Sequence, residues 1–256
     1  MTNKENTILA IDVGNTNIHW SYIKDGKLTD YKRNKHTELS LLPWDEVKKN
    51  NYSVVIAGAL IHMNGAVKTI ASDHGVKVFE ITLDKQNIIK NTYSTLGMDR
   101  VCNLIGALRS FSSLNTPVLV FDFGTATTMT ASDSKGNFLG GIITTGCETE
   151  LKAISSKTLS LPHVQLAKEQ KITVLDPLAN STEDAILHGT IIGQVGLVEY
   201  YLNLFKKKTN STPKIVFTGG NAPTILKFYK TFDLFDPHLA IKGIFYCYEE
   251  CFAKRV

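Results

Sequence analysis

The chain has 256 residues, of which 43% are hydrophobic, and this composition allows one large folded domain or two small ones. Charged residues make up 20% and the formal net charge is +4, which, without a Lys/Arg-rich block, argues against a nucleic-acid partner. No segment reaches the ~18 apolar residues of a membrane helix, and the polar start "MTNKENT" has no apolar run behind it. We therefore expect a soluble, cytoplasmic protein without a membrane partner, whose four cysteines are reduced.

The first half of the chain predicts a meander of strands, followed by alternating helices and strands. The apolar run "ILAIDVGNT" at 8–16 ends in an Asp-x-Gly turn, and a second turn at Gly26 leads into "KLTDYKRN" at 27–34. After a polar, helix-compatible stretch, the patterns predict a buried strand at 52–60, a helix at 66–75, a strand at 76–81 and a helix at 99–111.

The second half opens in the same way, with "VLVFDFGTA" at 118–126. Three glycines, Gly189, Gly193 and Gly196, lie inside a long predicted helix, where we expect them to allow close helix packing. The patterns predict a strand at 137–146, a helix at 147–158, the long helix at 181–205, a solvated turn at 205–210, a strand at 213–222 and a helix at 222–229.

The two Asp-x-Gly stretches belong to an internal repeat. They align without a gap, so that Asp12 lies over Asp122, and the same offset places Gly26 over Gly136. Each copy therefore predicts a strand, an Asp-x-Gly turn, a second strand, a glycine turn and a third strand. A match through two turns without a gap indicates a duplication.

The repeat predicts an α/β protein with two similar domains. Its period is too long for a solenoid, whose units have ~20–50 residues. Strands alternate with helices after each meander, which is typical of the α/β class. The polar, proline-containing stretch "SSLNTP" at 112–117 suggests the boundary, and we expect domains at 1–114 and 115–256.

A glycine turn at the end of a strand lets backbone N–H groups converge on an anion. Small polar residues such as Asn15, Thr16 and Thr125 add hydrogen-bond donors without blocking the approach. Two such turns facing each other could hold a polyphosphate, and a carboxylate beside each turn could hold the neutralising cation. A single Asp-x-Gly is more simply a plain β-turn, but two in register and a third glycine turn at Gly219-Gly220 favour phosphate binding.

The stretch "LGMDRVCN" at 96–103 supplies a candidate proton acceptor. Asp99 and Arg100 are adjacent at a predicted helix start, just after Gly97. An aspartate can accept the proton of an attacking hydroxyl, and an arginine can bind a carboxylate or phosphate with its planar guanidinium. By themselves, these residues are more simply an ordinary helix N-terminal aspartate beside a surface arginine.

Taken together, these motifs resemble the type III pantothenate kinases. The resemblance covers nearly the whole chain, and the motifs are specific as an ordered set. They are "DVGNTN" at 12–17, "GMDR" at 97–100, "DFGTATT" at 122–128, "GNFLGGII" at 136–143, "NSTEDAILHG" at 180–189, "FTGGNA" at 217–222 and "DPHLAIKGI" at 236–244.

The resemblance implies the actin and sugar-kinase superfold, with two ribonuclease-H-like (actin-like ATPase) domains and the active site in the cleft between them. It implies ATP-dependent phosphorylation of pantothenate at its primary hydroxyl, giving 4'-phosphopantothenate in the first step of coenzyme A biosynthesis. It also implies Mg²⁺, a monovalent cation such as K⁺ or NH₄⁺, and a homodimer.

The resemblance also assigns roles to individual positions. Asp99 matches the proton acceptor, and Asp122 matches the acid associated with the monovalent cation. Mg²⁺ is expected near Asp12, through the phosphates. The ATP contacts are Asp12, Gly14, Asn15, Thr16 and Asn17 in the first loop and Thr125 in the second, and the pantothenate contacts are Tyr93, Gly97, Arg100 and Thr182.

The sequence departs from the family at two places. Many members have an aspartate where this chain has Thr130, which could alter cation coordination or the order of the second loop. Many have Pro-Gly where this chain has Thr145-Gly146, which we interpret as a tolerated change in a turn.

Two alternative functions remain compatible with the sequence. One is another small-molecule kinase of the superfold, such as a sugar or acetate kinase. The other is a regulatory or accessory protein that binds nucleotide with little or no turnover. The set Asp12, Asp99, Arg100 and Asp122 is intact, which favours a catalyst.

Overall fold

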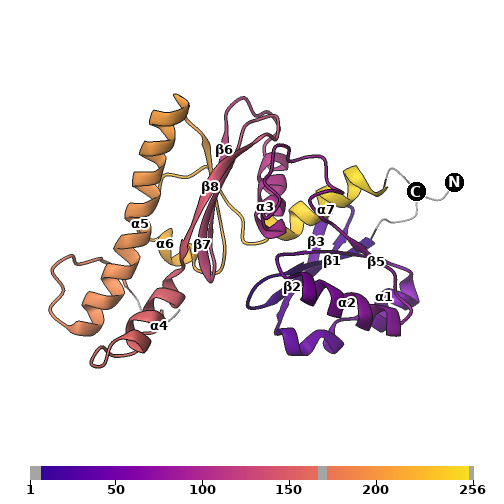
Figure 1. Ribbon diagram of the computed structural model, residues 1–256, viewed down its shortest axis with the longest axis horizontal. Helices are drawn as coiled ribbons and strands as arrows, with labels where there is room; N and C mark the ends of the chain where they lie inside the picture. Colours follow the sequence, from indigo (N-terminus) through magenta and orange to yellow (C-terminus); the bar gives the residue numbers. More distant parts are fainter. Residues whose placement is uncertain (1–6, 167–171, 254–256) are drawn as a thin grey trace. The chain divides into compact units, whose positions relative to one another are not determined.

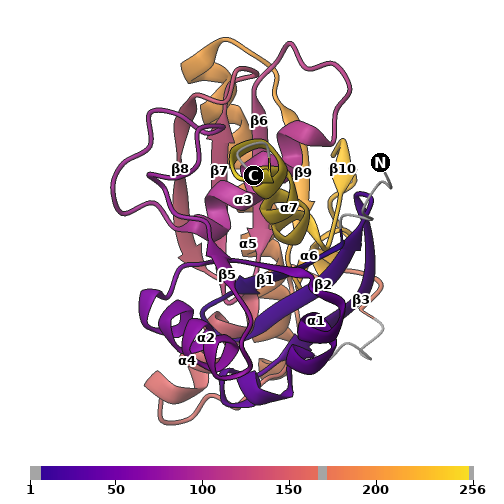
Figure 2. The same cartoon turned by 90° about the vertical axis from the view of Figure 1, so that its right-hand side faces the viewer.

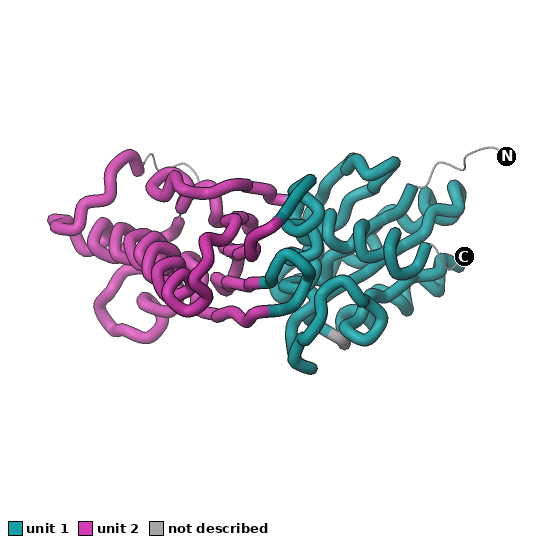
Figure 3. Tube along the Cα trace, turned by 90° about the horizontal axis from the view of Figure 1, so that it is seen from above, with its two compact units in different colours: residues 1–114, 132–138, 238–256 teal, residues 115–131, 139–237 magenta. Residues whose placement is uncertain are grey.

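A computed structural model describes residues 7–166 and 172–253 and divides the chain into two compact units (Figure 3). Each unit is built around one five-stranded sheet. Unit 1 comprises the chain up to residue 114 together with 132–138 and the end of the chain from 238, and unit 2 comprises 115–131 and 139–237.

This division differs from the expected domains, 1–114 and 115–256, at two segments. The turn at 132–138 and the C-terminal helix α7 (Leu239–Cys251) both belong to unit 1. Helix α7 packs against α3 (Met98–Arg109), and Figures 1 and 2 both show the two helices side by side. A single domain boundary assumes that each domain is one continuous segment. Here the end of the chain packs as helix α7 against the first sheet.

The sheet of unit 1 has the order β3-β2-β1-β4-β5. The expected meander forms the antiparallel part, and the two later strands add to β1 in parallel. These strands are β1 (Thr7–Val13), β2 (Ile18–Lys24), β3 (Lys27–Asn34), β4 (Ser53–Gly58) and β5 (Val78–Glu80).

Both faces of the central strand β1 are buried, which explains its continuous apolar run. Leu9, Ile11 and Val13 join a core that includes Trp44 and Val67. The elements contributing to this core from outside the sheet are η1 (His36–Leu41), α1 (Trp44–Asn50) and α2 (Ile61–Asp73), whereas α3 and α7 also contact the strands.

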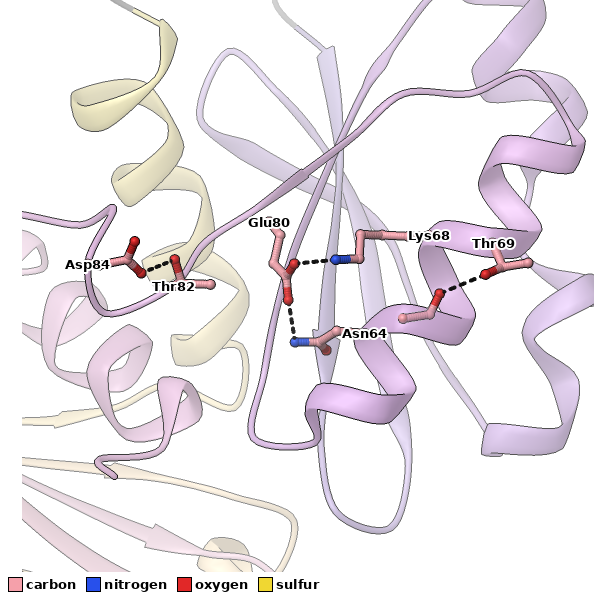
Figure 4. Close-up of polar contacts among 7 residues, drawn as sticks. Asn64, Lys68, Thr69, Glu80, Thr82 and Asp84 are labelled. Atoms are coloured by element: carbon pink, nitrogen blue, oxygen red, sulfur yellow. Dashed lines mark hydrogen bonds and ion pairs between the residues drawn. The ribbon is translucent and has the colours of Figure 1, made fainter. Parts of the chain in front are cut away.

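Helix α2 is tied to β5 by the carboxylate of Glu80 (Figure 4). Lys68 Nζ lies 2.6 Å from Glu80 Oε2, and Asn64 Nδ2 donates to Glu80 Oε1 at 3.0 Å. After β5, the chain turns at Thr82, whose hydroxyl donates to Asp84 at 2.6 Å. These contacts fix the start of the irregular segment that leads to α3.

The sheet of unit 2 has the order β10-β9-β6-β7-β8. Read from its other edge, this is the order of unit 1, because β8, β7, β6, β9 and β10 take the places of β3, β2, β1, β4 and β5. Its core lies against α4, α5 and α6, with Phe121, Phe123 and Phe217 at its centre. The elements are β6 (Val118–Phe123), β7 (Ala126–Ser132), β8 (Phe138–Thr145), α4 (Cys147–Lys157), α5 (Thr182–Thr209), β9 (Lys214–Thr218), α6 (Ala222–Ile225) and β10 (Leu234–Phe235).

Several predicted elements differ from the structure. The expected turn at 205–210 is wrong, because α5 continues through the lysines to Thr209 and ends at Asn210 in a left-handed conformation. The helix expected at 222–229 is shorter, and β10 was not predicted. Ser181 caps α5 by accepting a hydrogen bond from the backbone N–H of Asp184 at 3.1 Å.

All four cysteines are buried and free, which agrees with the reduced state expected. Among the helices of the described chain, none combines the length and apolar character needed to cross a membrane.

Candidate active site

The first Asp-x-Gly loop joins β1 to β2. Asp12 is near the end of β1, and the hairpin register pairs it with His19. The backbone N–H of Gly14 donates to the carbonyl of Asn17 at 3.1 Å, which closes the turn. Asn15 and Thr16 are exposed at its tip, where their backbone and side-chain groups can meet an anion.

Two histidines support this loop, and neither was predicted. His19 Nδ1 lies 3.8 Å from Asp12 Oδ2, and His36 Nε2 lies 2.9 Å from the carbonyl oxygen of Gly14. The contact of His19 follows from the hairpin register and could have been predicted from the repeat. His36 comes from the 3-10 helix η1, and its contact depends on the path of β3, which the sequence does not reveal.

Asp99 lies in the first turn of α3, with Gly97 at the N-cap. Its Oδ1 accepts the backbone N–H of Arg100 at 2.8 Å. Burial of the carboxyl raises the pKa of Asp99 above its ordinary value, and the nearby negative charge of Asp12 raises this pKa further. The structure therefore brings together Asp12 and Asp99, two carboxylates that are far apart in the sequence.

Arg100 and Tyr93 form a second pair in unit 1. The guanidinium of Arg100 donates from Nη1 to the hydroxyl of Tyr93 at 2.9 Å. The arginine is only 5% exposed, whereas Tyr93 is 46% exposed. A buried guanidinium beneath a half-exposed phenol can orient one polar group of a bound molecule.

In unit 2, Asp122 is near the end of β6, and the third glycine turn lies against it. Gly219 has φ +94°, and a Cβ atom at this position would lie 2.5 Å from Asp122 Oδ1. The backbone N–H of Asn221 donates to the carbonyl of Phe123 at 2.9 Å. The turn after β9 therefore needs glycine both for its conformation and for its close approach to the acid.

The second loop is also held by the N-terminus of α4. The carbonyl of Thr125 accepts the backbone N–H of Gly146 at 3.1 Å and the hydroxyl of Thr149 at 2.6 Å. Buried Gln194 of α5 donates to the carbonyl of Thr145 at 3.0 Å. The sequence does not predict that Thr149 and Gln194 hold this loop, because neither residue lies in a recognisable motif.

The remaining site residue, Thr182, is the exposed first residue of α5. It is distant in sequence from the loop at Asp122, and its expected contact with pantothenate stays a prediction. Within the residues described, no group of three or more His, Cys, Asp or Glu side chains can hold a metal ion.

Comparisons with known proteins give a consistent result. A family model described as Type III pantothenate kinase matches residues 8–203. A type III pantothenate kinase of Bacillus cytotoxicus is 27% identical, with 94% of this chain and 95% of that protein covered. One from Persephonella marina is also 27% identical, with 94% of this chain and 98% of that protein covered.

Solved structures of low sequence identity show the fold. A conserved putative Baf family transcriptional activator from Campylobacter jejuni has a TM-score of 0.59 at 20% identity, with 95% of this chain and 97% of that chain covered. MreB5 of Spiroplasma citri bound to ADP has a TM-score of 0.54 at 12% identity, with 98% of both chains covered. These likenesses agree with the expected actin and sugar-kinase superfold.

We predict that Asp99→Asn does not reduce the free energy of unfolding at neutral pH and can increase it. Because folding raises the pKa of Asp99, the native state binds more protons than the unfolded state between the ordinary and the raised pKa. The free energy of unfolding therefore falls as the pH rises through this interval. Above it, the native state is destabilised by the full amount that corresponds to the pKa difference. Urea unfolding at several pH values measures the difference, which should shrink as the pH is lowered.

Asp133→Asn is the control, because folding lowers the pKa of Asp133 instead of raising it. Burial acts to raise the pKa of Asp133, but hydrogen bonds from Asn137 and Lys135 outweigh it and lower this pKa. The variant should lose stability at neutral pH, and its deficit should vanish in acid. A loss of stability in Asp99→Asn as large as that in Asp133→Asn would contradict the assignment of a raised pKa to Asp99.

Proposed function

Because the chain belongs to the type III pantothenate kinase family, we propose that it transfers the γ-phosphoryl group of ATP to the primary hydroxyl of pantothenate, in the cytoplasm. The product is 4'-phosphopantothenate, and the reaction is the first step of coenzyme A biosynthesis. The observation that carries this proposal is the position of Asp99, a partly buried carboxylate in the first turn of α3 with a raised pKa.

Asp99 is the proton acceptor in this reaction. The hydroxyl oxygen of pantothenate forms a bond to the γ-phosphorus, the bond to the β,γ-bridging oxygen breaks, and ADP leaves. The hydroxyl proton passes to the carboxylate of Asp99. A raised pKa makes this carboxylate a stronger base than an ordinary aspartate, and this brings it nearer to the optimum for proton transfer at neutral pH.

Arg100, Tyr93, Gly97 and Thr182 bind pantothenate. The hydrogen bond between Arg100 and Tyr93 supports this role, because it holds the guanidinium beside the half-exposed Tyr93. Arg100 directly follows Asp99 in the first turn of α3. Pantothenate carries a carboxylate, and a guanidinium can bind such a group through two parallel hydrogen bonds. Binding of this kind orients the acceptor hydroxyl, which is a large part of catalysis in phosphoryl transfer.

The two Asp-x-Gly loops bind ATP. In the first loop, the exposed tip at Asn15 and Thr16 supports phosphate binding, together with Asp12, Gly14 and Asn17. In the second loop, the contact residue is Thr125, which is exposed and is fixed through its carbonyl by the start of α4. Backbone amides in such turns favour negative charge without adding a basic side chain.

The residues present fit Mg²⁺ and a monovalent cation. Mg²⁺ prefers oxygen ligands and usually binds through one or two carboxylates together with phosphates, and Asp12 offers a carboxylate beside the first loop. Asp122 offers a carboxylate to K⁺ or NH₄⁺ beside the second loop. When bound, these cations neutralise the charge of the phosphates.

The protein acts as a homodimer, and one face of α5 supports this. Ile192, Tyr200 and Leu204 are exposed on this helix, although they are apolar. The glycines of α5 do not pack closely against the described part of unit 2, because a Cβ atom at Gly189, Gly193 or Gly196 would meet none of its atoms within 4 Å. This smooth apolar face can instead pack against the same helix of a second copy.

The test of the proposed function is phosphate transfer from ATP to pantothenate, measured with and without K⁺ or NH₄⁺. The wild-type protein should form 4'-phosphopantothenate, and turnover should require the monovalent cation. Asp99→Asn should bind both substrates but lose turnover by about 100-fold or more, because the hydroxyl proton has no acceptor.

A panel of sugars and acetate under the same conditions is the control for acceptor identity. Transfer to one of these in preference to pantothenate would contradict the proposed substrate. Turnover in Asp99→Asn close to that of the wild type would contradict the role of Asp99.

For the homodimer, we predict that Leu204→Glu dissociates the protein into monomers, because a charge in an apolar interface is costly to bury. Light scattering after size-exclusion chromatography measures the mass. Leu41→Glu is the matched control, since Leu41 is an exposed leucine of η1, 69% exposed, outside α5. A monomeric wild type, or a dimer that survives Leu204→Glu, would argue against this interface.

A further inference from the structure

The turn between β7 and β8, residues Asp133–Asn137, is the part of the repeat that no function above explains. Its two strands belong to the sheet of unit 2, whereas the turn itself belongs to unit 1. The corresponding turn of the first repeat, at Gly26, joins β2 to β3. The second copy of the turn therefore has neighbours that the first copy does not have.

The β7–β8 turn is rigid because Asp133 organises it. Its Oδ1 accepts the backbone N–H groups of Lys135 at 2.9 Å and Asn137 at 2.8 Å. Its Oδ2 accepts the side-chain amide of Asn137 at 2.7 Å. These bonds within the turn leave Gly136 in a left-handed conformation, with φ +82°.

The turn pairs with the segment that precedes α3. The backbone N–H of Lys90 donates to the carbonyl of Gly136 at 2.8 Å, and the N–H of Phe138 donates to the carbonyl of Lys90 at 2.9 Å. A side-chain bond from Asn91 Nδ2 to Asn137 Oδ1, at 3.1 Å, adds to this pairing. Together these bonds form a short β-bridge that holds an otherwise irregular segment in place.

The same segment carries Tyr93, and Phe138 packs against its ring. The ring centroids are 5.6 Å apart with an interplanar angle of 70°, which is a favourable edge-to-face arrangement. The hydroxyl of Tyr93 in turn accepts the hydrogen bond from Arg100. A continuous set of contacts therefore runs from the β7–β8 turn through Phe138 and Tyr93 to the guanidinium of Arg100.

We propose that the β7–β8 turn positions the pantothenate-binding side chains, with Phe138 as a positioning residue that acts through Tyr93. This proposal rests on the proposed function, because it assigns the Tyr93–Arg100 pair to the acceptor. The contacts described for the turn lead through Phe138 to Tyr93 and Arg100, so we expect the turn to support acceptor binding and to leave ATP binding unaffected.

The repeat supplies a matched pair of variants, Gly136→Ala and Gly26→Ala. Both glycines lie in turns between strands with positive φ, +82° and +76°, so alanine strains the backbone similarly at each. A Cβ at Gly136 would overlap the carbonyl oxygen of Ile88, in the segment that the turn holds. Among the residues that the structure describes, a Cβ at Gly26 would meet only the ring of Phe245, at an ordinary distance of 3.7 Å.

The first measurement is hydrogen exchange of the backbone amides of residues 90–96 in the wild type and both variants, without substrates. Gly136→Ala should speed exchange in this segment, because its bridge to the turn is displaced. Gly26→Ala should leave exchange there as in the wild type. Equal exchange in all three proteins would overturn the proposal, whether or not the protein phosphorylates pantothenate.

The second measurement is steady-state kinetics with each substrate varied in turn. Gly136→Ala and Phe138→Leu should raise the KM for pantothenate by about tenfold, the upper end of what one aromatic pair contributes, and leave the KM for ATP unchanged. Phe138→Tyr, which keeps the ring, should restore the wild-type KM. Equal changes in both KM values, or no change in Phe138→Leu, would overturn the proposal.

The two measurements separate this proposal from the proposed function. If the wild type transfers no phosphate to pantothenate, the proposed function fails, and with it the assignment of the turn to the acceptor. If the wild type transfers phosphate but the pantothenate KM does not respond to Phe138→Leu, only the proposed role of the turn fails. Phe138→Leu also keeps the test decisive if Gly136→Ala does not fold, because it leaves the backbone of the turn intact.

Discussion

The candidate site depends on the placement of two carboxylates, Asp12 and Asp99, in the same part of unit 1. Asp12 is carried by the central strand β1, and Asp99 by the first turn of α3. Like charges held close together in a partly buried place raise the free energy of the doubly charged state. As a result, the carboxylate of Asp99 binds a proton more readily than an exposed aspartate does.

The fold maintains this unfavourable pair through elements whose own stability does not depend on it. Strand β1 is buried on both faces, and α3 packs along α7, so both carboxylates are attached to rigid parts of unit 1. The backbone N–H of Arg100 offsets part of the cost by donating to Asp99. This is the general arrangement of a functional site, in which local destabilisation is supported by the surrounding core.

The sequence predicts most reliably the elements that belong to the internal repeat or that have a clear apolar spacing. The turns at Gly26 and Gly136 both have positive φ, and the two sheets have the same strand order, as the duplication predicts. The helix that carries Asp99 was also recognisable from its apolar spacing. What could not be predicted were contacts between distant segments, such as Gln194 with Thr145, or the pairing of Lys90 with Gly136. These contacts depend on the path of irregular segments, for which the sequence has no periodic signal.

The interaction between the two carboxylates can be measured directly through the pKa of Asp99, by carboxyl-carbon NMR of the protein without ligands. In the wild type, this pKa should lie above the ordinary aspartate value. In Asp12→Asn, the pKa should fall, because the like charge is removed, and should stay somewhat raised, because the burial remains. An ordinary pKa for Asp99 in the wild type, or a raised pKa that does not respond to Asp12→Asn, would contradict the proposed interaction between the two residues.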